Sequence, residues 1–155
     1  MRITLFACLL LFACASLADG DLVLNLTAAD SRLRVILVNR TDQPILINKR
    51  FSIASQFDLG EMYFQINNCE SGKAFPFASK VRIGAPDRED FMVLSPADLV
   101  GREVDLEQLA EDHLMDNGKY CVKAVYRNKH ESRTGNAFKE ILESNIVEVN
   151  VDPSS

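Results

Sequence analysis

Histidine is scarce in this 155-residue sequence, because His113 and His130 are its only two. Neither lies at ligand spacing from a cysteine, which argues against a zinc site built from Cys and His. The His-Glu-x-x-His zinc helix, the Gly-x-Ser-x-Gly nucleophile elbow and a Cys with a His nearby are also missing. We therefore expect a non-enzymatic domain with no catalytic residue, metal or cofactor. Paired loop carboxylates acting as in glycosidases are the one enzymatic alternative, although no motif selects a pair.

A long hydrophobic run is missing as well. The most apolar stretch, residues 3–13, covers about eleven positions, whereas a membrane-spanning helix needs roughly twenty. It follows Arg2 and precedes small residues, which is typical of a signal peptide. We expect this leader to cover residues 1–18 and one mature domain to cover residues 19–155, in a secreted or periplasmic protein.

Cysteine is sparse, with four residues in the whole sequence. Cys8 and Cys14 fall within the expected leader, where residues 11–14 (Leu-Phe-Ala-Cys) resemble a bacterial lipoprotein box. In that alternative Cys14 is lipidated and the chain is anchored to a membrane. Cys69 and Cys121 are the pair left in the mature chain, and in an oxidising compartment we expect them to form one disulfide.

A basic excess is absent, because 17 Lys and Arg stand against 22 Asp and Glu and give a formal net charge of -5. This acidic balance argues against nucleic acid or an anionic membrane as a partner. Internal repeats and low-complexity runs are also absent. The mature chain has the size of one domain with one core, and we expect its partner to be a protein.

What the sequence does contain is a series of short segments in which apolar and polar residues alternate between turn residues. These segments predict strands at residues 22–26, 32–39, 45–48, 61–67, 91–94, 118–127 and 145–151. Residues 74–85 read as a short strand and a loop. Leu106, Leu109 and Leu114 have near-helical spacing, which predicts one short helical turn. The pattern favours an all-β fold, an immunoglobulin-like antiparallel β-sandwich.

Strand alternation also predicts where the disulfide lies. Cys121 falls between Tyr120 and Val122, so it points to the opposite face of its strand, and Cys69 is out of phase with Phe64. Both sulfur atoms should therefore lie outside the core. We expect the bridge to join a strand to a neighbouring strand or turn, and not to cross between the two sheets.

Three local motifs have structural or chance interpretations. Residues 117–120 (Asn-Gly-Lys-Tyr) resemble the start of the penultimate strand in immunoglobulin-like domains, where a Tyr ring packs at the corner and its hydroxyl binds the backbone. Asn25-Leu26-Thr27 and Asn39-Arg40-Thr41 are N-glycosylation sequons, which matter only in a eukaryotic source. We interpret both sequons as chance occurrences.

Several segments taken together resemble the N-terminal domain of the deuterolysin and peptidyl-lysine metalloendopeptidases. The resemblance spans residues 22–127 and rests on residues 38–45, 84–91, 94–96, 104–106 and 118–120. In that family a β-sandwich pro-domain precedes a zinc catalytic domain. No zinc-binding helix follows the sandwich in this sequence, so we expect no peptidase activity and carry over no active-site residue. The resemblance implies an inhibitor or chaperone-like partner of a zinc endopeptidase.

A binder without chemistry acts by covering surface, and loops held on a rigid sandwich are the usual place for recognition. The irregular segments 51–58 and 82–90 are the candidates, and the charged residues Arg88, Glu89 and Asp90 are the predicted binding site. The alternative, which lipidation at Cys14 would favour, is a surface or periplasmic module with a structural or ligand-binding role.

Overall fold

The structure, a computed structural model, describes residues 22–133 and 135–152. The expected signal peptide, and Cys14 with it, lies outside the described residues. The described part contains eight strands and one helix, in the order β1 (Leu22–Ala29), β2 (Arg32–Asn39), β3 (Ile45–Asn48), β4 (Met62–Asn68), β5 (Phe91–Leu94), β6 (Leu99–Asp105), α1 (Leu106–His113), β7 (Gly118–Tyr126) and β8 (Leu142–Val151). Within these residues no helix has the length and apolar character that crossing a bilayer requires.

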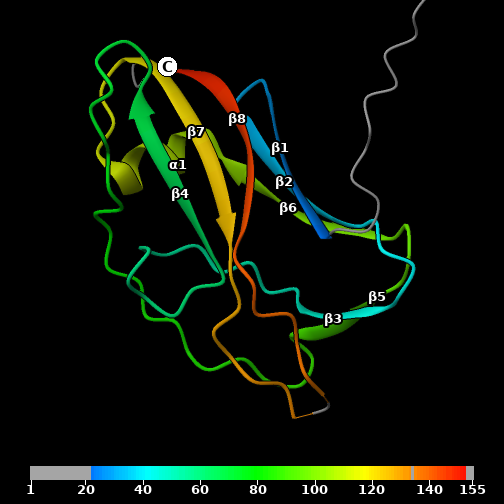
Figure 1. Cartoon of the computed structure of the whole chain (residues 1–155). Coiled ribbons are helices and arrows are strands. Elements are labelled where there is room, and N and C mark those ends of the chain that lie inside the picture. Colours follow the sequence, from blue (N-terminus) through cyan, green and yellow to red (C-terminus); the bar gives the residue numbers. More distant parts are fainter. Residues whose placement is uncertain (1–21, 134, 153–155) are drawn as a thin grey trace, which may run out of the picture.

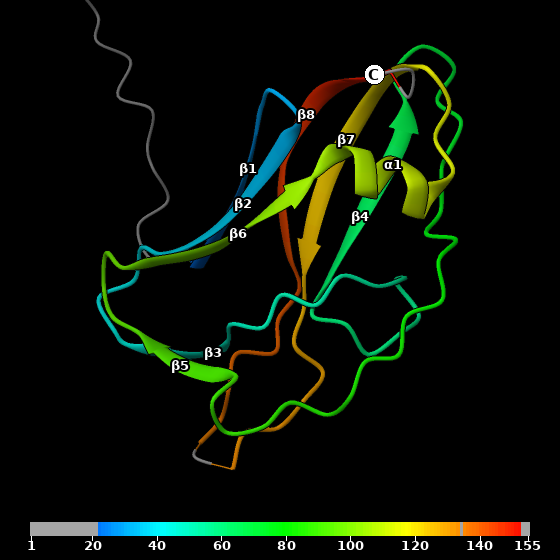
Figure 2. The same ribbon diagram turned by 180° about the vertical axis from the view of Figure 1, so that it is seen from behind.

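Two antiparallel three-stranded sheets, β1-β2-β6 and β4-β7-β8, pack against each other (Figure 1, Figure 2). In the immunoglobulin-like sandwich, strands A, B and E share one sheet and strands C, F and G share the other. The same arrangement holds here, with β1, β2 and β6 in the places of A, B and E, and β4, β7 and β8 in the places of C, F and G. Strand β3 is then an additional strand between B and C. The prediction of an all-β antiparallel sandwich is confirmed.

The small sheet β3-β5 prolongs the pairing of β2 with β6 beyond a bend. The Asn39 N–H donates to the Asp98 carbonyl at 3.0 Å, and the Asn39 carbonyl accepts from the Ala97 N–H at 2.8 Å. These two bonds connect the ladders on either side of the bend. The β2-β3 and β5-β6 segments therefore form one bent ribbon, which Figure 2 shows from behind.

Alternation along the strands sorts core from surface as the sequence predicts. The inner residues of three strands are buried: Leu33, Val35 and Leu37 on β2, Met62, Phe64 and Ile66 on β4, and Tyr120, Val122 and Ala124 on β7. On the outer face of β7, Lys119 and Lys123 form ion pairs with partly exposed glutamates of β8. One buried face and one solvated face per strand is the arrangement that a two-sheet core requires.

Strand β6 was not predicted, because its own sequence lacks alternation. Only Val104 is buried within it, while Gly101, Arg102 and Glu103 are exposed. The strand forms because β2 provides a template, with Val35 opposite Arg102 and Leu33 opposite Val104. Pairing with a neighbour decided this element, and no local pattern could show it.

The predicted helical turn forms as α1 and ends just before Leu114. The Asp105 carboxylate caps its start by accepting from the Glu107 and Gln108 N–H groups. Leu114 ends it in the left-handed conformation at φ 52° and is 71% exposed. Met115 enters the core instead, so the expected place of Leu114 on the apolar face is wrong.

Tyr120 occupies the corner position that the sequence motif predicts. Its ring is 1% exposed and packs edge to face on Phe75, with centroids 5.1 Å apart. Its hydroxyl donates to the Asp116 carbonyl at 3.0 Å. Ring burial and this bond fix the chain where it enters β7.

Candidate interaction site

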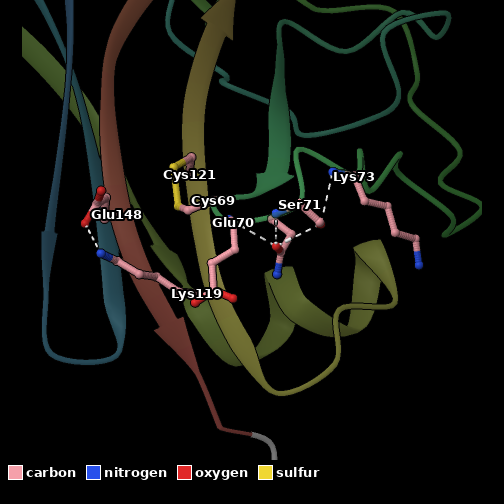
Figure 3. Close-up of a disulfide and its surroundings, with 8 residues drawn as sticks. Cys69, Glu70, Ser71, Lys73, Lys119, Cys121 and Glu148 are labelled. Atoms are coloured by element: carbon pink, nitrogen blue, oxygen red, sulfur yellow. Dashed lines mark hydrogen bonds and ion pairs between the residues drawn. A yellow bond between two sulfur atoms is a disulfide. The ribbon is translucent and has the colours of Figure 1, made fainter.

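The predicted disulfide joins Cys69, just after β4, to Cys121 of β7, with Cα atoms 5.2 Å apart (Figure 3). It links neighbours within one sheet and both sulfur atoms lie outside the core, so the prediction from alternation is confirmed. The Glu148 carboxylate is within 4.8 Å of the sulfur atoms and forms an ion pair with Lys119. Metals bind cysteine as the thiolate, and the two sulfur atoms here are bonded to each other. We therefore interpret this group as a structural disulfide that links the end of β4 to β7, and not as a metal site.

The predicted binding residues form a self-supporting turn before β5. The Asp90 carboxylate accepts from the Asp87 N–H at 2.9 Å, and the Asp87 carboxylate accepts from the Glu89 N–H at 2.8 Å. Arg88 and Glu89 are exposed and Asp90 is half-buried. The Asp90 carbonyl also accepts from the Lys49 N–H at 2.8 Å, which fixes the turn to the start of the segment after β3. The turn presents charge to solvent, and none of these residues lines the groove described below.

A buried ion pair organises the irregular end of the sandwich. The Glu61 carboxylate is 0% exposed and accepts from Arg50 Nε at 3.1 Å and Nη2 at 2.5 Å. It also accepts from the Ser52 N–H at 3.1 Å, while Arg50 Nη1 donates to the Gly84 carbonyl at 2.8 Å. A buried carboxylate loses its hydration, and these hydrogen bonds and the paired charge of Arg50 offset that cost. The pair therefore holds residues 50–52 close to the start of β4.

Strand β4 is an edge strand of its sheet (Figure 1). Its outer side is paired at both ends but not in the middle. At one end the Met62 N–H donates to the Ser52 carbonyl and the Met62 carbonyl accepts from Ala54, each at 3.1 Å. At the other end the Ile66 carbonyl accepts from the Phe75 N–H at 2.9 Å. Between them, the Phe64 N–H and C=O and the Ile66 N–H point outward and have no hydrogen-bond partner within the described residues.

The gap opens into a groove of about 300 Å³ whose walls are residues 54–57 and 74–77. Five of its lining residues are aromatic, Phe57, Tyr63, Phe64, Phe75 and Phe77, and no charged residue lines it. Phe57 is 84% exposed at the rim. An exposed aromatic side chain beside an uncharged groove is typical of an interaction surface.

Two cations border the groove. The Arg127 guanidinium lies 4.9 Å from the centroid of the Tyr63 ring, and the Lys73 ammonium lies 4.8 Å from that of the Phe75 ring. Within the part of the chain that the structure describes, neither cation has a carboxylate partner. Arg127 Nη2 instead donates to the Ser55 and Asp58 carbonyls, which steadies the loop that carries Phe57.

Helix α1 supports the second wall of the groove through a buried histidine. His113 Nδ1 lies 2.7 Å from the Phe75 carbonyl, and because a carbonyl only accepts, Nδ1 carries the proton. Nε2 is buried without a hydrogen-bond partner in the described structure. Burial lowers the pKa of His113, so the ring is neutral at neutral pH. The Ala78 N–H adds a bond to the Asp112 carbonyl at 2.8 Å.

The sequence singled out segment 51–58, and residues 54–57 of that segment do form one groove wall. The open edge of β4 was missed, because strand alternation distinguishes the two faces of a strand and not its two edges. No protein-family model matches this chain, and no curated protein matches it either. The site is therefore the basis on which its function is inferred.

Proposed function

We propose that this chain is a non-enzymatic protein-binding domain outside the cytoplasm, which holds part of its partner in the groove beside β4. The observation that carries the proposal is the gap in the outer pairing of β4, which opens into an uncharged aromatic groove. Unpaired strand edges are adhesive, and natural proteins normally cover or charge them. An edge left open at one place is a place for binding.

The opposite edge strand of the same sheet, β8, differs from β4 in its surroundings. On β8, the Asn145 side-chain amide donates to the Leu26 carbonyl at 2.9 Å and its oxygen accepts from the Leu26 N–H at 2.9 Å. These bonds tie β8 to β1 of the other sheet through a side chain. Beside β4, the opening is instead lined by uncharged residues, which makes it the more suitable place for a partner.

Zinc endopeptidases of the deuterolysin type are the partner class to test first, because the sequence resembles their pro-domain. We propose inhibition as the role. A domain that covers part of an enzyme's surface can slow hydrolysis without contributing a reacting group. The Cys69–Cys121 disulfide fits an oxidising compartment, where secreted peptidases also occur.

The experiment titrates the secreted full chain against a panel of deuterolysin-type endopeptidases, following both calorimetric binding and the rate of casein hydrolysis. Phe57→Ser should weaken the complex by about tenfold or more, as loss of an aromatic interface contact does. Ile146→Ser is the matched control, because Ile146 is 60% exposed on β8 and lies away from the groove.

Two results would count against the proposal in different ways. If micromolar chain neither binds nor slows any of these enzymes, the endopeptidase is not the partner and the surface-module interpretation leads. If binding occurs but Phe57→Ser leaves it unchanged, the interface lies elsewhere. The triple substitution of Arg88, Glu89 and Asp90 by Ala then tests the turn before β5.

A further inference from the structure

Resting on the proposed function, we infer that the groove takes a short extended segment of the partner protein as an added β-strand against β4, with a carboxylate of that segment near Arg127. Three backbone groups are available for the pairing, the Phe64 N–H and C=O and the Ile66 N–H. Strand addition to an exposed edge uses main-chain hydrogen bonds for affinity and side-chain pockets for selectivity.

The outward direction of these groups follows from the bonds on either side of them. The Glu61 carbonyl accepts from the Arg127 N–H at 2.7 Å, and the Cys69 N–H donates to the Lys119 carbonyl at 3.0 Å, so odd-numbered residues of this segment face β7. Met62 and Ile66 bond away from β7. Phe64 lies between them in the same alternation, and its N–H and C=O therefore point into the groove.

The extent of the gap limits the length of the added strand. From Phe64 to Ile66 a strand advances about 7 Å, which corresponds to roughly three residues of a partner. A groove of about 300 Å³ is at the small end of ligand-binding cavities, in keeping with such a short segment. Beyond it, residues 52–54 and 73–75 already occupy the edge. The segment is thus a short extended stretch of a loop or tail, and not a long strand.

Charge at the rim sets the chemistry of the segment. The groove lining carries no charge, which suits apolar side chains at the pairing positions. The guanidinium of Arg127 is held in place by the Ser55 and Asp58 carbonyls and has no carboxylate partner in the described chain. A carboxylate next to the apolar residues would supply one. The chain as a whole has a net charge of -5, so it does not attract acidic partners in general. Arg127 therefore favours a partner segment that carries a carboxylate at one defined position beside its apolar residues.

The first half of the test needs the free chain alone. In hydrogen-exchange NMR on the full ¹⁵N-labelled protein, the Phe64 and Ile66 amides should exchange at least about tenfold faster than the Met62 and Asn68 amides of the same strand, because only the latter pair have acceptors. Equal protection of all four amides would show that the edge is closed and would overturn the inference.

The second half adds a probe, a blocked hexapeptide of alternating valine and threonine with aspartate at one end. At millimolar concentration it should shift the Phe64 and Ile66 amide signals and slow their exchange by about tenfold or more. The same peptide with its central amide nitrogens methylated, and a version with lysine in place of aspartate, should each bind at least about tenfold more weakly. Phe57→Ser should weaken binding, and Ile146→Ser should not.

The outcomes separate this inference from the proposed function. If the peptide leaves both amides unchanged, or if the methylated peptide binds equally well, strand addition is rejected. A protein partner that still depends on Phe57 would then uphold the proposed function alone. If the peptide binds as expected while no endopeptidase does, strand addition stands and the partner class is wrong.

Discussion

At the scale of single residues, Asn39 shows how one buried side chain fixes a change of direction. Its amide nitrogen donates to the Gln43 and Leu94 carbonyls at 2.8 and 2.9 Å, and its oxygen accepts from the Thr41 N–H and hydroxyl. These bonds hold the bend between β2 and β3. Asn39 is 0% exposed and its nitrogen is fully used, so the folded chain cannot carry a glycan there despite the sequon.

His113 gives the residue-scale prediction, which concerns pH. Burial lowers the pKa of His113, and protonation would place an N–H on Nε2, where no acceptor is available in the described structure. The unfolded chain binds this proton near pH 6.5, and the folded chain binds it only at lower pH. The free energy of unfolding should therefore be highest above pH 6.5 and fall as the pH drops from there towards the native pKa.

The measurement is urea unfolding, followed by circular dichroism between pH 8 and pH 5, for the parent chain and for His113→Gln. The glutamine amide can still donate to the Phe75 carbonyl but does not titrate. The variant should lose the part of the pH dependence that begins at 6.5. An identical pH profile in both proteins would show that His113 does not titrate on unfolding.

At the scale of elements, β6 depends on a close approach to its neighbour. A Cβ atom on Gly101 would lie 2.3 Å from the Val35 carbonyl oxygen and 3.2 Å from the Ile36 Cα atom. Both are backbone atoms of β2, which cannot move aside without disturbing the core. A glycine in a strand interior often marks such an approach.

Gly101→Ala should therefore destabilise the fold by about 1–3 kcal/mol, the usual cost of forced overpacking. Gly84→Ala is the matched control, because a Cβ atom there meets nothing within 4 Å, and it should change stability by less than about 0.5 kcal/mol. Urea midpoints of the two variants give the comparison. Equal midpoints would mean that β6 moves away from β2 at little cost.

At the scale of the whole molecule, the disulfide is a staple within one sheet, so its effect falls mainly on the unfolded chain. Its cysteines are 52 residues apart, and a loop of that length corresponds to roughly 4 kcal/mol in the chain-entropy treatment. Replacing Cys69 and Cys121 together by Ala should lower the free energy of unfolding by about that amount. Glu148→Ala removes only a neighbouring exposed ion pair and should change it by less than about 1 kcal/mol.

Mass analysis without reducing agent checks the bond itself in freshly secreted protein. The intact chain should be lighter than its reduced form by two hydrogen atoms, with no disulfide-linked dimer. Two free thiols, or a double variant as stable as the parent, would contradict the role assigned to the bridge.

The sequence by itself determined the fold class, the core faces and the disulfide. Leu33, Val35 and Leu37 recur at every second position and Arg32 and Arg34 point the other way, so this period places one set of side chains on the core face. The same period predicted that the Cys121 side chain points away from the core, on the other face of β7 from the Tyr120 ring. These properties are local, because the direction of a side chain from a strand depends only on its position along that strand.

The tertiary structure alone decided β6, the exposure of Leu114 and the open edge of β4. Edge pairing depends on where other segments run, and the outer groups of Phe64 are free because residues 52–54 and 73–75 diverge on either side of it. The predicted binding residues Arg88, Glu89 and Asp90 lie in a solvent-facing turn, as charged loop residues usually do, but they do not line the groove. Which backbone groups stay unpaired is a property of contacts between distant segments, and no periodicity along the chain records it.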